Sequence, residues 1–334
     1  MQVLIVKISS MGDILHTLPA LTDASHVMPW ASYDWVVEEN FSEIPKWHPA
    51  VRRVISIANR RWRRSWFSKN TRQERYNFKN KIQSNHYDVI IDAQGLIKSA
   101  AFITHIAFGE KHGMDYKSAR EGLASIFYHK RHSIKKQQHA IKRIRQLFSS
   151  SLNYPLPNTP IDYAISKQFT TKCDEKAYII FLHSTTRFSK HWPEKNWRSL
   201  IKIISDAGYR IKLPWGTIHE RFRAQRLIEG VISANVLPFL SLTELAAQLA
   251  NAEAIVSVDT GLSHLAGALN CPNLTLYGPT DPRLIGSYGR YQKSLIAEDG
   301  NMRNLTVESV WKTLQLMLSK RIKNKYIVLS EPIL

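Results

Sequence analysis

The sequence predicts an α/β protein of two Rossmann-like domains, with parallel sheets, that face each other across a cleft. Short apolar runs typical of buried strands alternate with amphipathic segments typical of helices, the pattern of parallel sheets covered on both faces. Three prolines between residues 154 and 160 interrupt the alternation once, after which it starts again. The 334 residues suffice for two ordinary domains. We therefore expect an N-terminal domain over residues 1–160 and a C-terminal domain over residues 161–334, with a terminal helix that can pack back on the first.

The first domain opens with a buried strand over residues 3–7 and a tight loop over residues 9–13. A helix is expected over residues 14–27, and it should end before Pro29, because proline cannot continue a helix. The remaining elements follow the same criteria: strands over residues 33–38, 51–57 and 88–92, a helix from Leu96 and a helix over residues 135–150.

The second domain repeats the alternation, and several of its helices begin or end at recognisable residues. Gly208 and Gly230 each close a helix, and Ser241 with Glu244 forms a capping box. The predicted strands cover residues 177–183, 210–215, 236–239, 254–258 and 273–277, and the predicted helices cover residues 194–207, 218–229, 242–252, 262–269 and 306–321.

The composition indicates a protein that stays in a reducing cytoplasm. Cys173 and Cys271 are too few for a disulfide framework, and no CxxC pair points to a metal site. No apolar run approaches the roughly 20 residues that a bilayer span requires. A signal peptide is not predicted either, because Lys7 interrupts the first apolar run after four residues.

Positive charge is concentrated in one part of the chain. The formal balance is 46 − 27 = +19, and residues 51–150 alone carry 22 Lys or Arg against six Asp or Glu, 22 − 6 = +16. A segment this basic predicts an anionic partner: nucleic acid, an acidic membrane surface or a phosphorylated substrate. A solvated surface that only aids solubility is the alternative interpretation.

Polar residues follow several strands at the edge where open parallel sheets bind ligands. In the loop over residues 9–13, Gly12 permits close approach of the backbone, and the next helix offers unpaired N–H groups to an anion. Asp13 is a candidate functional group here and equally a candidate helix cap. Neither a GxGxxG fingerprint nor a P-loop is present, which disfavours a dehydrogenase or a nucleotide hydrolase.

Three loops of the second domain have the same character. In the first, the hydroxyls of Thr185 and Thr186 and the ammonium of Lys190 could meet a phosphate, whereas a metal site at His183 and His191 is disfavoured because no carboxylate stands at ligand spacing. In the others, a Glu could bind a ribose hydroxyl, and a helix start could hold a diphosphate. These loops contribute Glu220, after Trp215-Gly216, and Asp259, Thr260 and Gly261, of which Asp259 can equally be a turn residue.

A run of arginines with one tryptophan stands out within the basic segment. Arg60, Arg61, Arg63 and Arg64 suit phosphate and carboxylate groups, and Trp62 could pack against a lipid or a sugar. The same composition would serve single-stranded nucleic acid, although no RNP, KH or helix-turn-helix pattern supports that function.

Several of these stretches resemble the ADP-heptose:lipopolysaccharide heptosyltransferases, over roughly residues 1–320. The motifs are VLIVKISSMGDILHTLPA at residues 3–20, KHWP at 190–193, SVDTGLSH at 257–264 and YGPTDP at 277–282. The arginine run, DAQGL at 92–96 and KHGMD at 111–115 resemble the branch of the family that adds the first heptose to the Kdo region of the lipopolysaccharide inner core.

The resemblance implies a GT-B fold and inverting transfer of L-glycero-D-manno-heptose from ADP-heptose to Kdo-lipid A, with no metal and no cofactor. It implies that Asp13 is the general base. The donor residues on the C-terminal domain would be Thr185, Thr186, Lys190, Glu220, Asp259, Thr260, Gly261, Leu262 and His264. The acceptor residues on the N-terminal domain would be Ser10, Gly12, Arg60, Arg61, Arg63, Arg64, Lys98 and Arg120.

The expected location is the cytoplasmic face of the inner membrane, with peripheral contact to its anionic surface and no nucleic-acid partner. Phe188 and Ser189 stand where the family pattern has acidic residues, a departure that affects the finer contacts of the donor loop. Two other functions remain open: a sister heptosyltransferase that acts on an already heptosylated core, and a basic two-domain protein that binds RNA.

Overall fold

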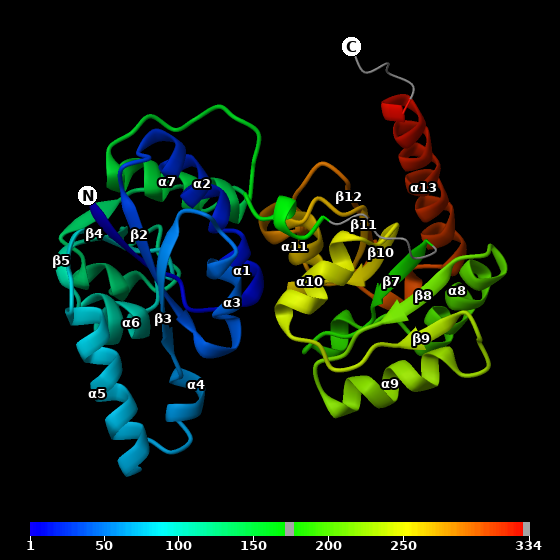
Figure 1. Ribbon diagram of the computed structural model, residues 1–334, viewed down its shortest axis with the longest axis horizontal. Helices are drawn as coiled ribbons and strands as arrows, with labels where there is room; N and C mark the ends of the chain where they lie inside the picture. Colours follow the sequence, from blue (N-terminus) through cyan, green and yellow to red (C-terminus); the bar gives the residue numbers. More distant parts are fainter. Residues whose placement is uncertain (171–176, 330–334) are drawn as a thin grey trace. The chain divides into compact units, whose positions relative to one another are not determined.

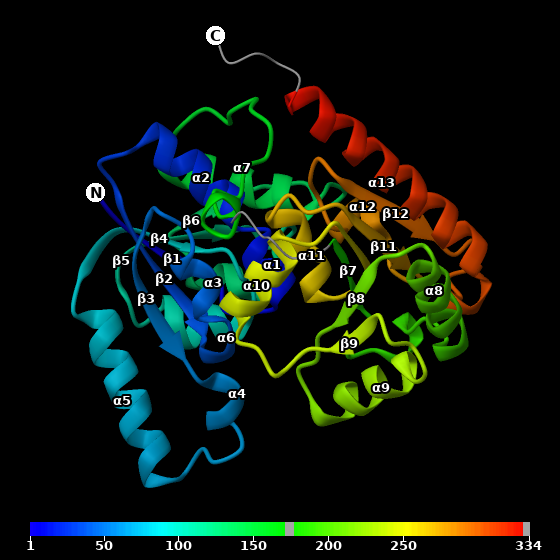
Figure 2. The ribbon, with the colours of Figure 1, turned by 45° about the vertical axis from the view of Figure 1, so that its right-hand side comes forward.

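The computed structural model describes residues 1–170 and 177–329, with the side chains of the last helix described as far as residue 319. Contacts between residues divide the chain into two compact units, Met1–Ile165 and Ser166–Leu334. The sequence placed this division at residues 160/161. Each unit contains one parallel sheet of six strands with helices packed on it (Figures 1 and 2).

The first unit has the strand order β3-β2-β1-β4-β5-β6. Its strands are β1 (Gln2–Val6), β2 (Ser32–Glu38), β3 (Val51–Ile57), β4 (His86–Asp92), β5 (Phe108–Met114) and β6 (Lys130–His132). Its helices are α1 (Met11–Leu15), α2 (Leu18–Val27), α3 (Glu43–Lys46), α4 (Asn59–Trp62), α5 (Lys69–Gln83), α6 (Ile97–Ser99) and α7 (Ala140–Leu152), with short helical turns at Ala100–Thr104 and Gly122–Phe127.

Helices cover both faces of this sheet because successive side chains of its central strand point to opposite sides. Leu4 and Val6 of β1 pack in one cluster with Phe78 and Ile82 of α5. Helices α2 and α7 pack on each other over the opposite face, where α7 contacts β4, β5 and β6 (Figure 1). The apolar residues of β1 are therefore buried from both sides, as its continuous apolar run predicts.

The first unit differs from the prediction in several elements. The short helices α3 and α4 were not predicted, and the helix expected over residues 135–150 begins only at Ala140. The helix expected over residues 14–27 is two helices, because α1 ends at Leu15 and Pro19 stands in the first turn of α2, where a missing N–H costs nothing. Strands β5 and β6 were not predicted. Helix α5 was not predicted either, and it begins with Ser68, whose side chain accepts a hydrogen bond from the amide of Thr71.

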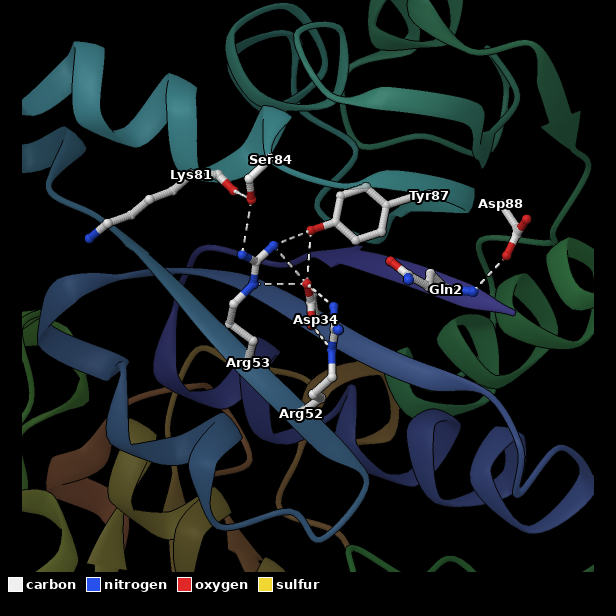
Figure 3. A network of polar contacts seen from close by, with 8 residues as sticks. All are labelled: Gln2, Asp34, Arg52, Arg53, Lys81, Ser84, Tyr87 and Asp88. Atoms are coloured by element: carbon white, nitrogen blue, oxygen red, sulfur yellow. Dashed lines mark hydrogen bonds and ion pairs between the residues drawn. The ribbon is translucent and has the colours of Figure 1, made fainter.

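Asp34 joins three strands of this sheet through its fully buried carboxylate (Figure 3). It accepts hydrogen bonds from Arg52 and Arg53 of β3, at 2.9–3.0 Å, and from the hydroxyl of Tyr87 of β4, at 2.9 Å. Burial, together with the Asp34 carboxylate, raises the pKa of Tyr87 to about 12 and keeps this hydroxyl a donor. A buried charge with several donors is satisfied, which allows it to remain inside the sheet.

The second unit has the strand order β12-β11-β10-β7-β8-β9. Its strands are β7 (Tyr178–Leu182), β8 (Arg210–Leu213), β9 (Ala234–Val236), β10 (Ala254–Val258), β11 (Asn273–Tyr277) and β12 (Gln292–Ile296). Its helices are α8 (Glu194–Asp206), α9 (Ile218–Ile228), α10 (Leu242–Ala250), α11 (Gly261–Ala268), α12 (Pro282–Ile285) and α13 (Val307–Leu329). Strand β12 was not predicted, and β9 lies earlier than the predicted residues 236–239.

Two tryptophans organise the core of the second unit. Trp192 and Trp197 are fully buried, with their ring centroids 5.1 Å apart in an edge-to-face arrangement. The described part of α13 joins this core through Val310, Leu314 and Leu318. Packing of the terminal helix on the first unit stays a prediction.

Both sheets have the same topology when the strands of each unit are counted from its first. The order is 3-2-1-4-5-6 in each case, so the direction of strand succession reverses between β1 and β4 and between β7 and β10. At such a switch point the following loops diverge and leave a crevice beyond the carboxyl ends of the strands. None of the helices in the described residues is long and apolar enough to cross a membrane. Cys271 is buried, and Cys173 lies outside the described residues.

Candidate functional site

In the first unit, the loops after β1 and β4 are held together by one amide side chain. The side-chain oxygen of Gln94, after β4, accepts hydrogen bonds from the backbone N–H groups of Ile8 at 3.0 Å and Ser9 at 3.1 Å. Lys7 adds a second tie, because its buried ammonium donates to the carbonyl of Ala93 at 2.8 Å. The two loops that flank the switch point therefore form one structured edge.

Asp92 fixes the second of these loops from inside the sheet. Its buried carboxylate accepts hydrogen bonds from the amides of Gln94 and Gly95 at 2.9 and 3.0 Å, and from the hydroxyls of Ser99 and Thr104 at 3.0 and 2.9 Å. Burial raises the pKa of Asp92 in spite of these donors. The network stabilises the conformation in which Gln94 reaches the loop after β1.

Asp13 is the third residue of the short helix α1 and lies at the edge that these contacts build. Its Oδ2 atom accepts hydrogen bonds from both the backbone N–H and the hydroxyl of Ser10, each at 2.9 Å. Among the described residues, no hydrogen-bond donor reaches its Oδ1 atom. Asp13 thus caps the helix through one oxygen and leaves the other for a further donor, so that its two sequence-based interpretations are compatible.

The electrostatic surroundings keep the Asp13 carboxyl ionised at neutral pH. Burial raises its pKa, but the Lys7 ammonium, the two bonds from Ser10 and the Arg120 guanidinium outweigh burial and lower the pKa below its ordinary value. The pKa of Lys7 is itself lowered by burial, which the carboxylates of Asp13 and Asp92 oppose. Arg120, predicted as an acceptor residue, therefore acts on the same carboxylate as Lys7.

The other predicted acceptor residues near this edge differ in exposure. Gly12 is buried in α1 beside Asp13, whereas Ser10 is exposed at the start of that helix. Lys98 is exposed in α6, in the segment that follows Gln94.

The four arginines of the basic run lie on and after α4, and the structure separates them by their contacts. Arg61 is engaged, with ion pairs to Glu39 at 3.0 Å and to Glu74 at 2.9 Å. The guanidinium of Arg60 lies over the ring of Phe41, 5.5 Å from its centroid. Arg63 and Arg64 are exposed and make no ion pair within the described part of the chain.

The expectation that Trp62 packs against a lipid or a sugar is wrong. Trp62 is only 6% exposed, belongs to the apolar core of the first unit and packs edge-to-face on Phe78 of α5. Its indole N–H donates to Glu74. The tryptophan therefore attaches α4 to α5 and does not face a ligand.

In the second unit, the loops after β7 and β10 are joined by an ion pair. The ammonium of Lys190 contacts the carboxylate of Asp259, and their side chains are 15% and 7% exposed. The hydroxyl of Thr185 donates to the backbone carbonyl of Asp259 at 3.1 Å. Three predicted donor residues thus meet at the switch point of this sheet.

The loop that carries Lys190 is held at its far end. The ring Nε2 of His191 lies 2.7 Å from the carbonyl oxygen of Thr185, and the indole N–H of Trp192 donates to the carbonyl of Leu305 at 2.9 Å. Phe188, in the same loop, is 87% exposed, and its ring stacks on that of His191 with 6.1 Å between centroids. The contact between His191 and Thr185 therefore fixes the loop that carries Lys190, and the buried side chain of Trp192 anchors this loop in the core.

The remaining predicted donor residues fall into two groups. Thr260, Gly261 and Leu262 form the start of α11 directly after Asp259, where Thr260 makes no side-chain capping bond, and His264 is buried in the same helix. Thr186 is exposed. Glu220 belongs to the capping box of α9, where its carboxylate accepts the amides of Gly216 at 2.7 Å and Thr217 at 3.1 Å, so the structure gives this residue a local role beside the predicted ribose contact.

Two residues of the first site were missed by sequence reasoning. Lys7 was noted as an interruption of an apolar run and as part of the first family motif, and Gln94 as part of the DAQGL motif, without a role for either side chain. A lysine at the end of an otherwise apolar buried strand was an available signal for Lys7, because such a charge needs anionic partners. In the described residues, no group of three or more His, Cys, Asp or Glu side chains could hold a metal ion.

Comparison with known proteins adds three findings. The family model of glycosyltransferase family 9 (heptosyltransferase) matches residues 75–314. Lipopolysaccharide heptosyltransferase 1 of Escherichia coli (strain K12) is 56% identical over 312 residues, which are 93% of this chain and 98% of that protein. The solved structure of E. coli heptosyltransferase WaaC with ADP is 54% identical, with a TM-score of 0.92 over 95% of this chain and 100% of that one.

A likeness of fold alone extends further. The structure of E. coli ADP-heptose lps heptosyltransferase II has a TM-score of 0.78 at 19% identity, covering 96% of this chain and 99% of that one. The two parallel sheets, together with the match to heptosyltransferase WaaC at 54% identity, define a glycosyltransferase built of two Rossmann-like units, as predicted. Because the family model matches more than half of its residues, the chain belongs to glycosyltransferase family 9, the heptosyltransferases.

The contact between Lys190 and Asp259 generates a prediction about stability. Replacing the lysine in Lys190→Met leaves the Asp259 carboxylate buried without its partner, which costs about 3–5 kcal/mol for buried pairs. The double variant Lys190→Met/Asp259→Asn should regain much of this loss, because it removes both charges. Urea unfolding of the ligand-free protein measures the free energies of unfolding.

The pair of Arg283 and Asp281 in the same unit supplies a control. Their side chains are 86% and 38% exposed, so Arg283→Met should change stability little. A Lys190→Met variant as stable as the wild type would show that the ion pair contributes nothing to the ligand-free fold.

Proposed function

We propose that this chain transfers L-glycero-D-manno-heptose from ADP-heptose to the Kdo region of Kdo-lipid A, with inversion at the anomeric carbon and without a metal. The observation that carries the proposal is the Asp13 carboxylate, ionised at neutral pH, with one oxygen available beside Lys7 and Arg120. Membership of the heptosyltransferase family and 56% identity to a relative named lipopolysaccharide heptosyltransferase 1 support transfer of a heptose to lipopolysaccharide, and the similarity to WaaC solved with ADP supports an ADP-linked donor.

Asp13 acts as the general base in this scheme. Its Oδ1 atom takes the proton of a Kdo hydroxyl while the oxygen of that hydroxyl forms a bond to the anomeric carbon of the heptose. The bond from the same carbon to the diphosphate oxygen breaks, and ADP leaves from the opposite side. Because the pKa of Asp13 is lowered, its carboxylate is ionised in nearly all molecules at neutral pH, which suits a proton transfer concerted with attack.

The second unit provides the charge that the leaving group requires. Lys190 neutralises the diphosphate, and the first amides of α11, after Thr260, add the positive end of the helix dipole. Thr185 and Thr186 offer hydroxyls to the same phosphates, Glu220 binds the ribose, and Asp259, Gly261, Leu262 and His264 complete the donor surface, as the family resemblance implies.

The acceptor is a lipid that bears phosphates and carboxylates, and the basic groups of the first unit match it. Arg63 and Arg64 are the exposed arginines whose charges no described carboxylate neutralises. Arg120 acts on the Asp13 carboxylate, and Lys98 is exposed in α6, so both offer further positive charge. Such an enzyme works at the cytoplasmic face of the inner membrane, in peripheral contact with an anionic surface.

Removal of the base tests the reaction assignment. Asp13→Asn should lower kcat by a factor on the order of 10²–10⁴, because the amide keeps the helix cap but cannot accept the proton. Turnover of ADP-heptose with Kdo-lipid A measures the effect, and transfer to a heptosylated core serves as the comparison for the sister reaction. A variant with undiminished kcat would leave Asp13 with a capping role alone.

Removal of the neighbouring cation should shift the pH dependence of the same reaction. The Lys7 ammonium lowers the pKa of Asp13, so Lys7→Met should raise this pKa and protonate the base at a higher pH. The acid limb of the kcat/KM profile should therefore move to higher pH, while activity at the plateau falls much less than in Asp13→Asn. An acid limb that does not move would exclude Lys7 as the source of the lowered pKa.

The free arginines generate a prediction about the acceptor. The double variant Arg63→Ala/Arg64→Ala should raise KM for Kdo-lipid A about tenfold or more and leave KM for ADP-heptose nearly unchanged, because donor groups lie on the other unit. Added salt should weaken acceptor binding in the wild type more than in the variant. Lys135 and Lys136 form an exposed pair in the same unit, so their double Ala variant is the control for loss of two charges.

A further inference from the structure

The segment formed by α4, α5 and the loop between them, residues 59–83, extends beyond the end of β3 in both views of the first unit (Figures 1 and 2). We call this segment the basic arm. It contains nine Lys or Arg against one Glu, 9 − 1 = +8, and half of the basic excess of residues 51–150 is therefore concentrated here. Its one carboxylate, Glu74, is already engaged by Arg61 and Trp62.

One large apolar side chain stands at the connecting loop of the basic arm. Phe67 is 81% exposed, although each of the two tryptophans of the arm has a partner. Trp62 is in the core, and Trp66 lies beneath the guanidinium of Arg75, 3.6 Å from the ring centroid. Phe67 therefore remains as the aromatic residue of the loop that the fold turns to solvent.

The loop presents Phe67 on a defined turn. The amide of Ser68 donates to the carbonyl of Ser65 at 3.0 Å, and Ser68 then caps α5 through Thr71. The hydroxyls of Ser65 and Thr71 lie 3.1 Å apart across the same turn. The phenyl ring is thus held outward by its flanking residues, which reduces the conformational entropy that docking would cost.

Exposed cationic residues flank Phe67 on both sides in the sequence. Arg63 and Arg64 precede it and Lys69 and Arg72 follow it, all exposed. An exposed apolar side chain flanked in sequence by exposed cations matches a bilayer with an anionic surface, because cations can meet the headgroups while the phenyl ring enters the boundary of the acyl chains. Stable attachment to a membrane generally needs both insertion of an apolar group and electrostatic attraction, and the basic arm supplies both.

We propose that the basic arm docks the enzyme on an anionic phospholipid bilayer, with Phe67 inserted between the headgroups. This inference deepens the proposed function, since it names the surface by which the enzyme reaches a lipid acceptor. It assigns to Phe67 a role that the transfer reaction does not require. Docking by this surface needs neither ADP-heptose nor Kdo-lipid A.

Binding to vesicles that contain no acceptor tests the proposal. The wild type should sediment with vesicles of phosphatidylcholine and phosphatidylglycerol and not with phosphatidylcholine alone. Phe67→Ser should weaken this binding about tenfold, as expected when a phenyl ring no longer leaves water. Phe67→Leu should restore most of it, because the proposal requires apolarity and not aromatic character.

Matched variants separate docking from loss of any exposed group. Trp30 of the same unit is 70% exposed and lies outside the basic arm, so Trp30→Ser should leave vesicle binding unchanged. Arg63→Ser/Arg64→Ser should weaken binding and reduce its salt dependence, whereas Lys135→Ser/Lys136→Ser should affect it much less. Thermal unfolding of each variant confirms that the fold is retained.

Three outcomes would overturn the proposal: Phe67→Ser binding as tightly as the wild type, Trp30→Ser weakening binding equally, or wild-type binding that requires Kdo-lipid A in the vesicle. Transfer to a deacylated, water-soluble acceptor should be the same for Phe67→Ser and the wild type. Failure of the wild type to transfer heptose would contradict the proposed function but leave the vesicle result intact. The two hypotheses therefore fail separately.

Discussion

The reversal of strand order in each sheet is the constraint on which both candidate sites depend. Between β1 and β4, and again between β7 and β10, successive connections run to opposite sides, so the loops that follow these strands diverge above a shared edge. Each unit then ties its diverging loops together by a polar contact: Gln94 to the backbone of Ile8 and Ser9 in the first, Lys190 to Asp259 in the second. Two independent sheets thus place their chemistry by the same topology.

The two ties have different consequences for ligands. In the first unit the ties are made by the amide of Gln94 and the ammonium of Lys7, both to backbone groups, so the Asp13 carboxylate takes no part in them. In the second unit the tie is itself an ion pair, so a diphosphate that reaches Lys190 competes with the Asp259 carboxylate. In the proposed reaction, part of the attraction between Lys190 and the diphosphate would be offset by the loss of that pair, and the start of α11 would gain importance as a second source of positive charge.

The sequence predicted those parts of the fold whose signal is local. The buried strands of both sheets and the polar loops after them follow from apolar runs that end in Gly, Ser, Thr or Asp, and these positions carry both candidate sites. Strand β12 was missed because Gln292–Ile296 is partly exposed and lacks an apolar run, and α5 because few of its side chains, chiefly Phe78 and Ile82, reach the core. The hydrogen bonds from Ile8 and Ser9 to Gln94 span more than 80 residues, and no local pattern reveals a partner at that distance.

Composition located the basic segment but could not tell which of its residues stabilise the fold and which are available to a partner. That distinction follows from the charges that the fold neutralises internally. Arg61 forms ion pairs with Glu39 and Glu74, and Trp62 is buried against α5, so these two residues build the arm. Arg63 and Arg64 are exposed and form no ion pair in the described residues, so their charges are available to a partner. They shortly precede the exposed Phe67 in the sequence. A surface kept basic only for solubility accounts for the cations but not for the exposed phenyl ring in the same loop. The proposed docking on an anionic bilayer accounts for both features, because the cations would meet the headgroups and the ring would meet the acyl chains at the same boundary.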